Sequence, residues 1–295
     1  MDFRPVTLED KDIFRRFLAG RRRELITYSF SSFFLWRDWD PYTWAIVGDA
    51  LVVKSSFRGL DSICVPIAAD DDAVLAATEQ MIATETGGGF CIGEATEADI
   101  ALYEKAWPSR FQAEAYPDGA NYIYRREDLA LLKGNKYHGK RNQLRHFERA
   151  CPDCELRPIN EELIPGCRRL MEIWRERQGA NDPEIEMEYQ GCLDGLDALS
   201  RLDCEGLALT VKGQVAAFSI GEMLNDDTYA VHIEKGDTDF PGVYQAMNCL
   251  SSRTLPETVR YINRAEDMGD AGLRRAKESY HPCRMEMEYY LRLKK

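Results

Sequence analysis

The sequence predicts an α/β protein with mixed sheets, divided into two lobes. Its 295 residues correspond to one large domain or to two of ordinary size. Hydrophobic residues make up 44% of the chain, which is enough for real cores and excludes a disordered protein. Strand-like and helical patterns alternate within each half. The boundary is expected near residues 125–150, which gives an N-terminal lobe at 1–130 and a C-terminal lobe at 131–295.

The first half starts with helices and continues into strands. Thr7 is an N-cap candidate for a helix over residues 8–18, in which Phe14, Phe17 and Leu18 form an apolar stripe. Further segments follow as a short buried helix 30–36, strands 43–47, 50–57 and 62–67, amphipathic helix 70–86 and strand 90–93. This order predicts a mixed α/β layer rather than a simple parallel βαβ winding.

The second half shows a similar mixture of helices and strands, with clearer patterns. The expected elements are strand 155–159, helices 161–178 and 187–202, strands 207–211, 215–223 and 228–234, helix 242–255, strand 259–263, helix 271–280 and strand 285–293. Pro282 ends the last of these helices, because the residue before a proline is disfavoured in helical conformation. Strand, two helices, three-strand meander, helix, strand, helix, strand is the order of a GNAT-type acyltransferase domain.

Charge and cysteine content exclude several classes of protein. The net charge of −12 argues against general coating of nucleic acid, although a local basic patch can still bind phosphate. No apolar run of eighteen residues and no N-terminal signal pattern are found, so we expect a cytoplasmic chain without a transmembrane segment. Because the chain is expected in the cytoplasm, the nine cysteines are predicted to be reduced thiols. Cys151-Pro-Asp-Cys154 has no second cysteine pair at zinc spacing, and no metal site is predicted.

One local basic patch does occur, just after the expected boundary. On a helix that starts near Tyr137, Arg141, Arg145 and Arg149 recur every four residues and share a face. The full set of cations is Lys133, Lys136, Lys140, Arg141, Arg145 and Arg149, against the single acid Glu148. The patch is either a docking site for phosphates or an ordinary solvated helix face.

Four stretches carry a resemblance to a known family. They are LKGNKYHGKRN at 132–142, HIEK at 232–235, GVYQAMN at 242–248, and 262–282, which begins INRAEDMGD. Together they resemble the soluble C-terminal domain of bacterial phosphatidylglycerol lysyltransferases, over nearly the whole chain. The resemblance implies two GNAT-like lobes in tandem, distantly similar to Fem-type aminoacyltransferases. Membrane-bound relatives transfer an aminoacyl group from aminoacyl-tRNA to a lipid headgroup.

The resemblance also implies donor, partners and location. Aminoacyl-tRNA would be a donor substrate, so no cofactor is expected. The expected partners are the acceptor end of tRNA and an anionic lipid headgroup, which the chain would meet at the membrane surface as a peripheral cytoplasmic protein.

Coenzyme A is less favoured as a donor than the fold alone suggests. GNAT domains that use acetyl-CoA hold its pyrophosphate with backbone amides of a glycine-rich turn at a helix start. The corresponding turn, DTDFPGVY at 237–244, has one glycine, a proline without an N–H and two acids. Gly242 either contributes to ligand binding or simply begins a helix.

The segment 261–280 is the most suggestive place for chemistry, because ligands bind at the carboxyl ends of strands in open α/β sheets. Transfer from an ester needs a carboxylate to orient an amine, stabilisation of an oxyanion and a proton route. Asp267 or Glu234 would hold the amine, and Lys277 or Arg274 would neutralise the oxyanion or a terminal phosphate. Tyr280 is placed like the hydroxyl that some GNAT domains use as general acid. The alternative is an ordinary ion pair between Asp267 and Arg264 or Arg274.

The candidate catalytic residues are therefore Glu234, Asp267, Lys277 and Tyr280. The candidate substrate-binding residues are Lys136, Lys140, Arg141, Asn142, Arg145, His232, Gly242, Asn248, Asn263, Arg264 and Arg274. His232 and Glu234 alternate along a strand, so both are expected on the same side. His232 is either a base or a hydrogen-bonded core residue.

The leading hypothesis is an aminoacyl (or related acyl) transferase that works by direct attack on the donor. One alternative is a conventional acyl-CoA N-acyltransferase. The other is a non-catalytic lobe that binds tRNA, lipid or a protein partner.

Overall fold

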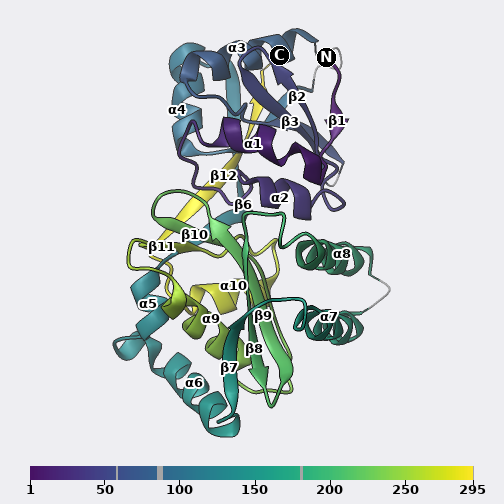
Figure 1. Ribbon diagram of the computed structural model, residues 1–295. Helices are drawn as coiled ribbons and strands as arrows, with labels where there is room; N and C mark the ends of the chain where they lie inside the picture. The colour runs from purple at the N-terminus through teal and green to yellow at the C-terminus, as the bar shows by residue number, and fades with distance from the viewer. Residues whose placement is uncertain (58, 85–88, 180–181, 295) are drawn as a thin grey trace. The chain divides into compact units, whose positions relative to one another are not determined.

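A computed structural model describes residues 1–57, 59–84, 89–179 and 182–294 (Figure 1). The chain divides into two compact units. Unit 1 comprises Met1–Asn121, Glu266–Gly269 and Met285–Lys295, and unit 2 comprises Tyr122–Ala265 and Asp270–Arg284. Unit 1 thus recruits two late segments of the chain. The division of the sequence into lobes at 1–130 and 131–295 stays a prediction.

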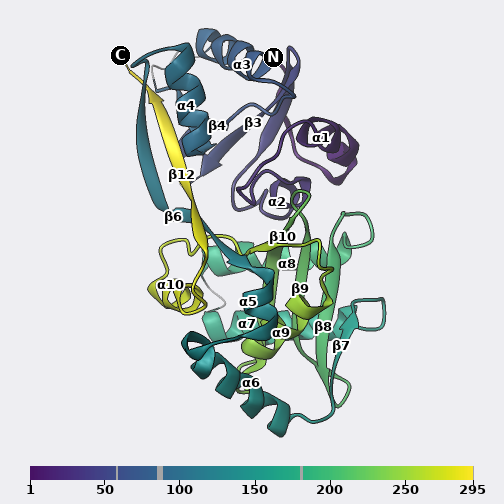
Figure 2. The same cartoon turned by 90° about the vertical axis from the view of Figure 1, so that its left-hand side faces the viewer.

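Unit 1 is a mixed sheet with helices on both faces. Its strands are β1 (Arg4–Pro5), β2 (Thr43–Val47), β3 (Ala50–Phe57), β4 (Leu60–Cys64), β5 (Cys91–Ala95), β12 (Arg284–Leu293) and the first part of β6 (Phe111–Arg125), in the spatial order β1-β2-β3-β4-β5-β12-β6. Among the strand pairs of unit 1 whose register is described, β4 and β5 are parallel and the others are antiparallel. Helices α1 (Lys11–Leu18) and α2 (Phe30–Leu35) cover one face, and α3 (Asp71–Thr84) and α4 (Glu97–Ala106) the other (Figures 1 and 2).

Helix α4, strand β6 and the two-residue strand β1 of unit 1 were not expected from the sequence. Helix α4 begins at a capping box, in which the Thr96 hydroxyl and the Asp99 carboxylate each bind the other residue's backbone. Strand β6 runs through Pro117 and Gly119, residues that ordinarily interrupt strands. The helix expected at 70–86 is described as far as Thr84, and its predicted end lies outside the described residues.

Unit 2 has the element order expected for a GNAT-type lobe. After α5 (Arg126–Leu131) and α6 (His138–Ala150) come β7 (Cys154–Pro158), α7 (Ile164–Gln178), α8 (Pro183–Asp197), β8 (Glu205–Val211), β9 (Gln214–Met223), β10 (Thr228–Gly236), α9 (Val243–Thr254), β11 (Tyr261–Asn263) and α10 (Ala271–Glu278). The prediction of a mixed α/β fold with this order is confirmed.

The sheet of unit 2 is ordered β7-β8-β9-β10-β11, with the last residues of β6 at its end. Neighbours are antiparallel apart from the β10–β11 pair, which is parallel. Helices α7 and α8 lie on one face, and α5 and α9 on the other (Figures 1 and 2). A core of buried aromatic and aliphatic side chains, including Tyr124, Tyr137 and Phe147, fills the space beneath α5, α6 and α9.

A β-bulge in β10 sets which side chains face which helices. Val231 pairs with Gly221 and Ile233 pairs with Ile220, so His232 is an extra residue in the strand. An extra residue reverses the alternation of side chains beyond it. Val231 and Glu234 consequently line the same pocket although three positions separate them. The bulge thus determines the direction of Glu234.

Candidate functional site

The candidate site lies where β10 and β11 stop pairing. Their parallel register covers Thr228 to Ala230 on β10 and ends at Asn263 on β11. Beyond it, the backbone N–H of Arg264 donates to the Tyr122 carbonyl oxygen, and the Tyr122 N–H donates to the Ala265 oxygen, both at 3.0 Å. The chain after β11 therefore stays with β6 while β10 continues to Gly236. Beyond the end of this register, β10 and the segment after β11 contact each other through side chains.

Glu234 and Arg264 make that connection. The guanidinium Nη2 of Arg264 lies 2.7 Å from Oε1 of Glu234, and the two side chains are only 14% and 10% exposed. With its amide oxygen turned towards Arg264, Asn248 accepts from Nη1 at 2.7 Å and from Nε at 3.1 Å. Burial raises the pKa of Glu234, although the charges of Arg264 and Lys277 oppose this. The carboxylate is thus held in place and is more basic than an exposed one.

Two lysines and a tyrosine complete the cluster. The Lys277 ammonium donates to the Arg264 carbonyl oxygen at 2.6 Å. The Lys140 ammonium lies 4.1 Å from the centre of the Tyr280 ring, and its pKa is lowered by burial and by the charge of Arg264. Arg264 lies 5.5 Å from the same ring. Arg264 and Lys277 thus act on the Glu234 carboxylate, while Lys140 lies over the neighbouring Tyr280 ring. The excess of cations over carboxylates in this cluster favours an anionic ligand.

Buried tyrosines hold the end of α10 in this cluster. The Tyr124 hydroxyl donates to the Lys277 carbonyl oxygen at 2.8 Å, and the Tyr137 hydroxyl donates to that of Tyr280 at 3.0 Å. Burial raises the pKa of Tyr280, whose hydroxyl is hydrogen-bonded with Gln245. Tyr280 is therefore neutral near pH 7, and its hydroxyl is suited to donate a proton or a hydrogen bond.

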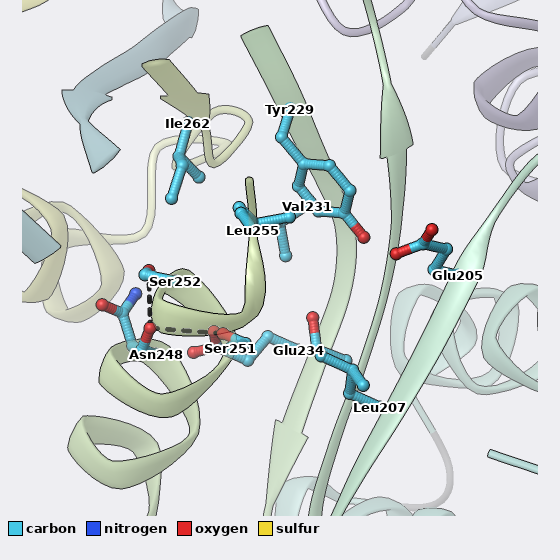
Figure 3. A pocket seen from close by; sticks show the side chains of 11 residues that line it. Glu205, Leu207, Tyr229, Val231, Glu234, Asn248, Ser251, Ser252, Leu255 and Ile262 are labelled. Atoms are coloured by element: carbon cyan, nitrogen blue, oxygen red, sulfur yellow. Dashed lines mark hydrogen bonds between the residues drawn. The ribbon is translucent and has the colours of Figure 1, made fainter. Parts of the chain in front are cut away.

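A pocket opens beside this cluster, between the sheet and α9 (Figure 3). Its cavity volume is about 20 Å³, which is room for about one water molecule, and it is partly open to solvent. Its lining residues are Glu205, Leu207, Ser219, Tyr229, Val231, Glu234, Asn248, Ser251, Ser252, Leu255 and Ile262. Glu234 and Asn248 belong to both the cluster and the pocket wall, so a ligand in the pocket would contact the charged network. Gln245, Ser251, Ser252 and Tyr229 were not anticipated, because no local pattern distinguishes them from core or surface positions.

The sequence candidates separate into those that the structure brings together and those that it does not. Glu234, Asn248, Arg264, Lys277, Tyr280 and Lys140 form the cluster just described. Asn263 is buried, and its side chain accepts from the Ala265 N–H at 2.8 Å. Arg274 is half-buried on α10. Asp267 belongs to unit 1, where its carboxylate accepts from the Gly269 N–H at 2.9 Å, so its catalytic role stays a prediction.

Several residues of the predicted basic segment have other partners within unit 2. Arg141 donates to the carbonyl oxygens of Leu132 and Gly134, which follow the end of α5. Lys136 lies 3.5 Å from Asp128, and the side chain of Asn142 lies 3.0 Å from that of His138. Arg145 is exposed. Lys140 is the member of the patch that reaches the cluster around Glu234.

The turn before α9 has few amides left for a phosphate. The N–H of Asp237 donates to the Ala216 carbonyl oxygen, and that of Asp239 donates to the Asp237 carboxylate. The N–H groups of Phe240 and Val243 donate to the carbonyl oxygens of Asp237 and Phe240, in that order. Arg177 binds the carboxylates of Asp237 and Asp239, each at 2.7 Å. Gly242 has a φ of +90°, and a Cβ there would lie 2.4 Å from the Gln143 carbonyl oxygen. A glycine is thus needed at this position for close packing of α6 against α9.

The expectation that His232 and Glu234 face the same side is wrong. His232 lies 2.9 Å from Glu222, which pairs with Ala230 and points away from the face that carries Ser219. Glu234 shares the pocket wall with Ser219. The bulge at His232 is the physical reason, because it adds one residue to a pattern that repeats every two.

The fold and this site define a class of protein. The sheet of unit 2 is mixed and contains a three-strand meander. Its parallel strands β10 and β11 separate, and a polar cluster lies where they do so. This is the arrangement of a GNAT-type acyltransferase lobe. Among the described residues, no helix is both long enough and apolar enough to cross a bilayer.

Comparison with known proteins gives the family. The chain belongs to the family of the phosphatidylglycerol lysyltransferase C-terminal domain, which matches residues 21–292. Family and fold together point to an acyltransferase, and the resemblance seen in the sequence is confirmed.

Two solved structures share this fold. A conserved protein of unknown function from Bacteroides thetaiotaomicron is 33% identical, with a TM-score of 0.90 and full coverage of both chains. The C-terminal domain of a putative lysylphosphatidylglycerol synthetase from Agrobacterium fabrum is 13% identical, with a TM-score of 0.66 over 98% of this chain and 93% of that one.

An uncharacterized protein of Mycoplasmoides gallisepticum is 26% identical over 191 residues. The match covers 62% of this chain and 60% of that protein, so the chain spans less than two thirds of this curated relative.

Proposed function

We propose that this protein transfers an aminoacyl group from aminoacyl-tRNA to an amine or hydroxyl acceptor, at the cluster around Glu234 in unit 2. The observation that carries the proposal is the position of the Glu234 carboxylate. It lies in a pocket wall, is held by Arg264 and is made more basic by burial. A carboxylate of this kind can take a proton from a nucleophile or hold an ammonium group.

The proposed reaction is direct transfer. The acceptor nitrogen or oxygen attacks the ester carbonyl carbon of the aminoacyl-tRNA, a new amide or ester bond forms, and the ester bond to the terminal ribose breaks. Glu234 takes the proton from the acceptor, and the neutral Tyr280 hydroxyl is suited to donate to the ribose oxygen as it leaves. Lys140 and Lys277 supply positive charge for the oxyanion and for the terminal phosphate.

Two features favour aminoacyl-tRNA over coenzyme A as donor. Four amides of the turn before α9 already donate within the chain, and two carboxylates stand beside them. A diphosphate would meet repulsion there rather than a helix N-terminus with open donors. The cations at Lys140 and Lys277 instead suit a single phosphate near the reacting ester. The proposal accordingly needs no cofactor.

The proposed partners follow from the donor and from the family. The acceptor end of tRNA would contact the cations of unit 2. An anionic lipid headgroup is the proposed acceptor, which the chain would reach as a cytoplasmic protein peripheral to the membrane. Co-sedimentation with phosphatidylglycerol vesicles, compared with phosphatidylcholine vesicles, tests the membrane part of this proposal separately.

The donor is tested by incubating the chain with tRNA charged with radiolabelled amino acids and following label into lipid, amine and hydroxyl acceptors. A parallel thermal-shift titration with acetyl-CoA tests the competing donor. We expect transfer from charged tRNA and no saturable shift with acetyl-CoA. A saturable shift with acetyl-CoA alone would overturn the proposal, and tight tRNA binding without turnover would favour a non-catalytic binding module.

A further inference from the structure

A second polar cluster lies on the face of the unit 2 sheet that Glu222 and His232 share. Cys204, Glu222 and His232 each place one ligand atom within 4.8 Å of those of the other two. Glu222 and His232 are buried, and Cys204 is half-buried. We propose that these three side chains bind a zinc ion.

The sheet itself brings the three residues together. Cys204 directly precedes β8, where Glu205 pairs with Gly221 of β9. Glu222 follows on β9 and pairs with Ala230 of β10. The bulge in β10 then places His232 against Glu222, at 2.9 Å between Nε2 and Oε1. Two neighbouring strands and the residue just before a third therefore supply the ligands, which makes the site largely formed before a metal binds.

The donor set selects the metal. A thiolate, an imidazole and a carboxylate are the ligand types that Zn²⁺ takes, at about 2.3, 2.0–2.1 and 2.0–2.2 Å. Mg²⁺ and Ca²⁺ prefer oxygen ligands alone and do not fit a cysteine. Small movements from the present separations bring the three atoms around one tetrahedral ion. A fourth position remains for water or a small ligand.

His232 is not explained by core packing alone. Its side chain is 0% exposed, yet Nδ1 has no hydrogen-bond partner among the described residues. Buried ring nitrogens are ordinarily satisfied, so His232 is an unusual core residue. An ion bound through Nε2, the nitrogen that faces Glu222, would leave the ring proton on Nδ1 and would displace the proton of the Cys204 thiol into solvent.

The zinc site is independent of the acyl transfer proposed above, because its ligands lie outside the cluster of Glu234 and Arg264. The two sites are connected through β10, since the bulged residue His232 is a ligand and Glu234 follows it in the same strand. A bound ion would hold the bulge that turns Glu234 towards the pocket.

The test uses the full chain, freed of metal with a chelator, dialysed, and titrated with Zn²⁺ or Co²⁺ alone. We expect one ion per chain by mass spectrometry of metals, thiolate charge-transfer absorption with Co²⁺, and a melting temperature that rises with Zn²⁺ concentration. Cys204→Ser and Glu222→Gln should each weaken Zn²⁺ binding by more than about 100-fold, since losing even an outer-shell partner costs 10–100-fold.

Two cysteine variants serve as matched controls. Cys283→Ser removes an exposed thiol, and Cys154→Ser removes one member of the Cys151–Cys154 pair, so both should bind Zn²⁺ like the unaltered chain. Circular dichroism of each variant establishes that it is folded. The proposal is overturned if the unaltered chain shows no saturable binding, if Cys204→Ser binds as tightly as the unaltered chain, or if Cys154→Ser abolishes binding.

Discussion

The carboxylate of Glu234 and the guanidinium of Arg264 lie 2.7 Å apart, although the backbone register between β10 and β11 ends before either residue. The pair therefore spans the parting of two parallel strands. Asn248 holds the same guanidinium from α9. This three-residue network joins two strand segments and a helix, and it leaves Glu234 facing the pocket (Figure 3).

Replacing Glu234 with Gln should lower the kcat of aminoacyl transfer by about 100-fold or more, because general-base catalysis contributes factors of that size. The KM for charged tRNA should change little, since the surrounding cations remain. Glu205→Gln, which alters another acid in the pocket wall, is the matched control and should retain most activity. Equal losses in the two variants would argue against a catalytic role for Glu234.

The same substitution should also destabilise unit 2. It leaves the buried charge of Arg264 without its carboxylate, and removing one partner of a buried pair costs about 3–5 kcal/mol. Urea unfolding measures this cost. Arg168→Gln breaks the exposed pair with Asp197 and should cost less than about 1 kcal/mol. A Glu234→Gln variant as stable as the Arg168→Gln variant would contradict the structural role of the pair.

Tyr280→Phe removes only the hydroxyl and keeps the ring that packs against Lys140 and Tyr124. If the hydroxyl donates to the leaving oxygen, kcat should fall by about 100-fold while the melting temperature changes by only a few degrees. Tyr289→Phe changes an exposed hydroxyl in unit 1 and should leave kcat unaltered. Single-turnover kinetics with charged tRNA distinguish a loss in the chemical step from a loss in binding.

Gly242→Ala should destabilise the protein more than Gly213→Ala. Both glycines have φ values in the left-handed region, at +90° and +80°, which costs an alanine about 1–2 kcal/mol. A Cβ on residue 242 would in addition lie 2.4 Å from the Gln143 carbonyl oxygen, whereas one on residue 213 meets nothing within 4 Å. Chemical denaturation of the two variants measures the difference. Equal stabilities would show that α6 and α9 can move apart at no cost.

The half-buried carboxylate of Glu94 in unit 1 should make stability depend on pH. Burial, together with the charges of Asp40 and Glu266, raises the pKa of Glu94 to about 8 from an ordinary value of 4.5. The folded state then holds a proton that the unfolded state releases, so the free energy of unfolding should fall as pH rises from about 4.5 to about 8. Burial also raises the pKa values of Glu288 and Asp40, so Glu94→Gln should reduce this dependence without abolishing it. The exposed control Glu161→Gln should leave it unchanged. Identical profiles for the three proteins would refute the assignment.

Local sequence was sufficient for most of the element order and for part of the site. The meander, the helices around it and the stop at Pro282 follow from periodicity and turn residues, which act over a few positions. Arg264, Lys277 and Tyr280 were identified because charged and hydroxyl side chains clustered after a predicted strand. Helix α4 and the long strand β6 were not predicted. The helix has only a weak apolar stripe, and Pro117 and Gly119 interrupt the strand pattern.

The sequence by itself determined which side chains are available for chemistry and roughly which elements carry them. The tertiary structure alone decided how they are directed. One extra residue at His232 reverses the alternation of β10, sends Glu234 into the pocket and leaves His232 with Glu222 on the other face. No local pattern marks that residue, because a bulge is defined by pairing with a neighbouring strand. Tertiary structure also decides the role of Arg141. The sequence predicted a phosphate contact, whereas its guanidinium donates to carbonyl oxygens near the end of α5.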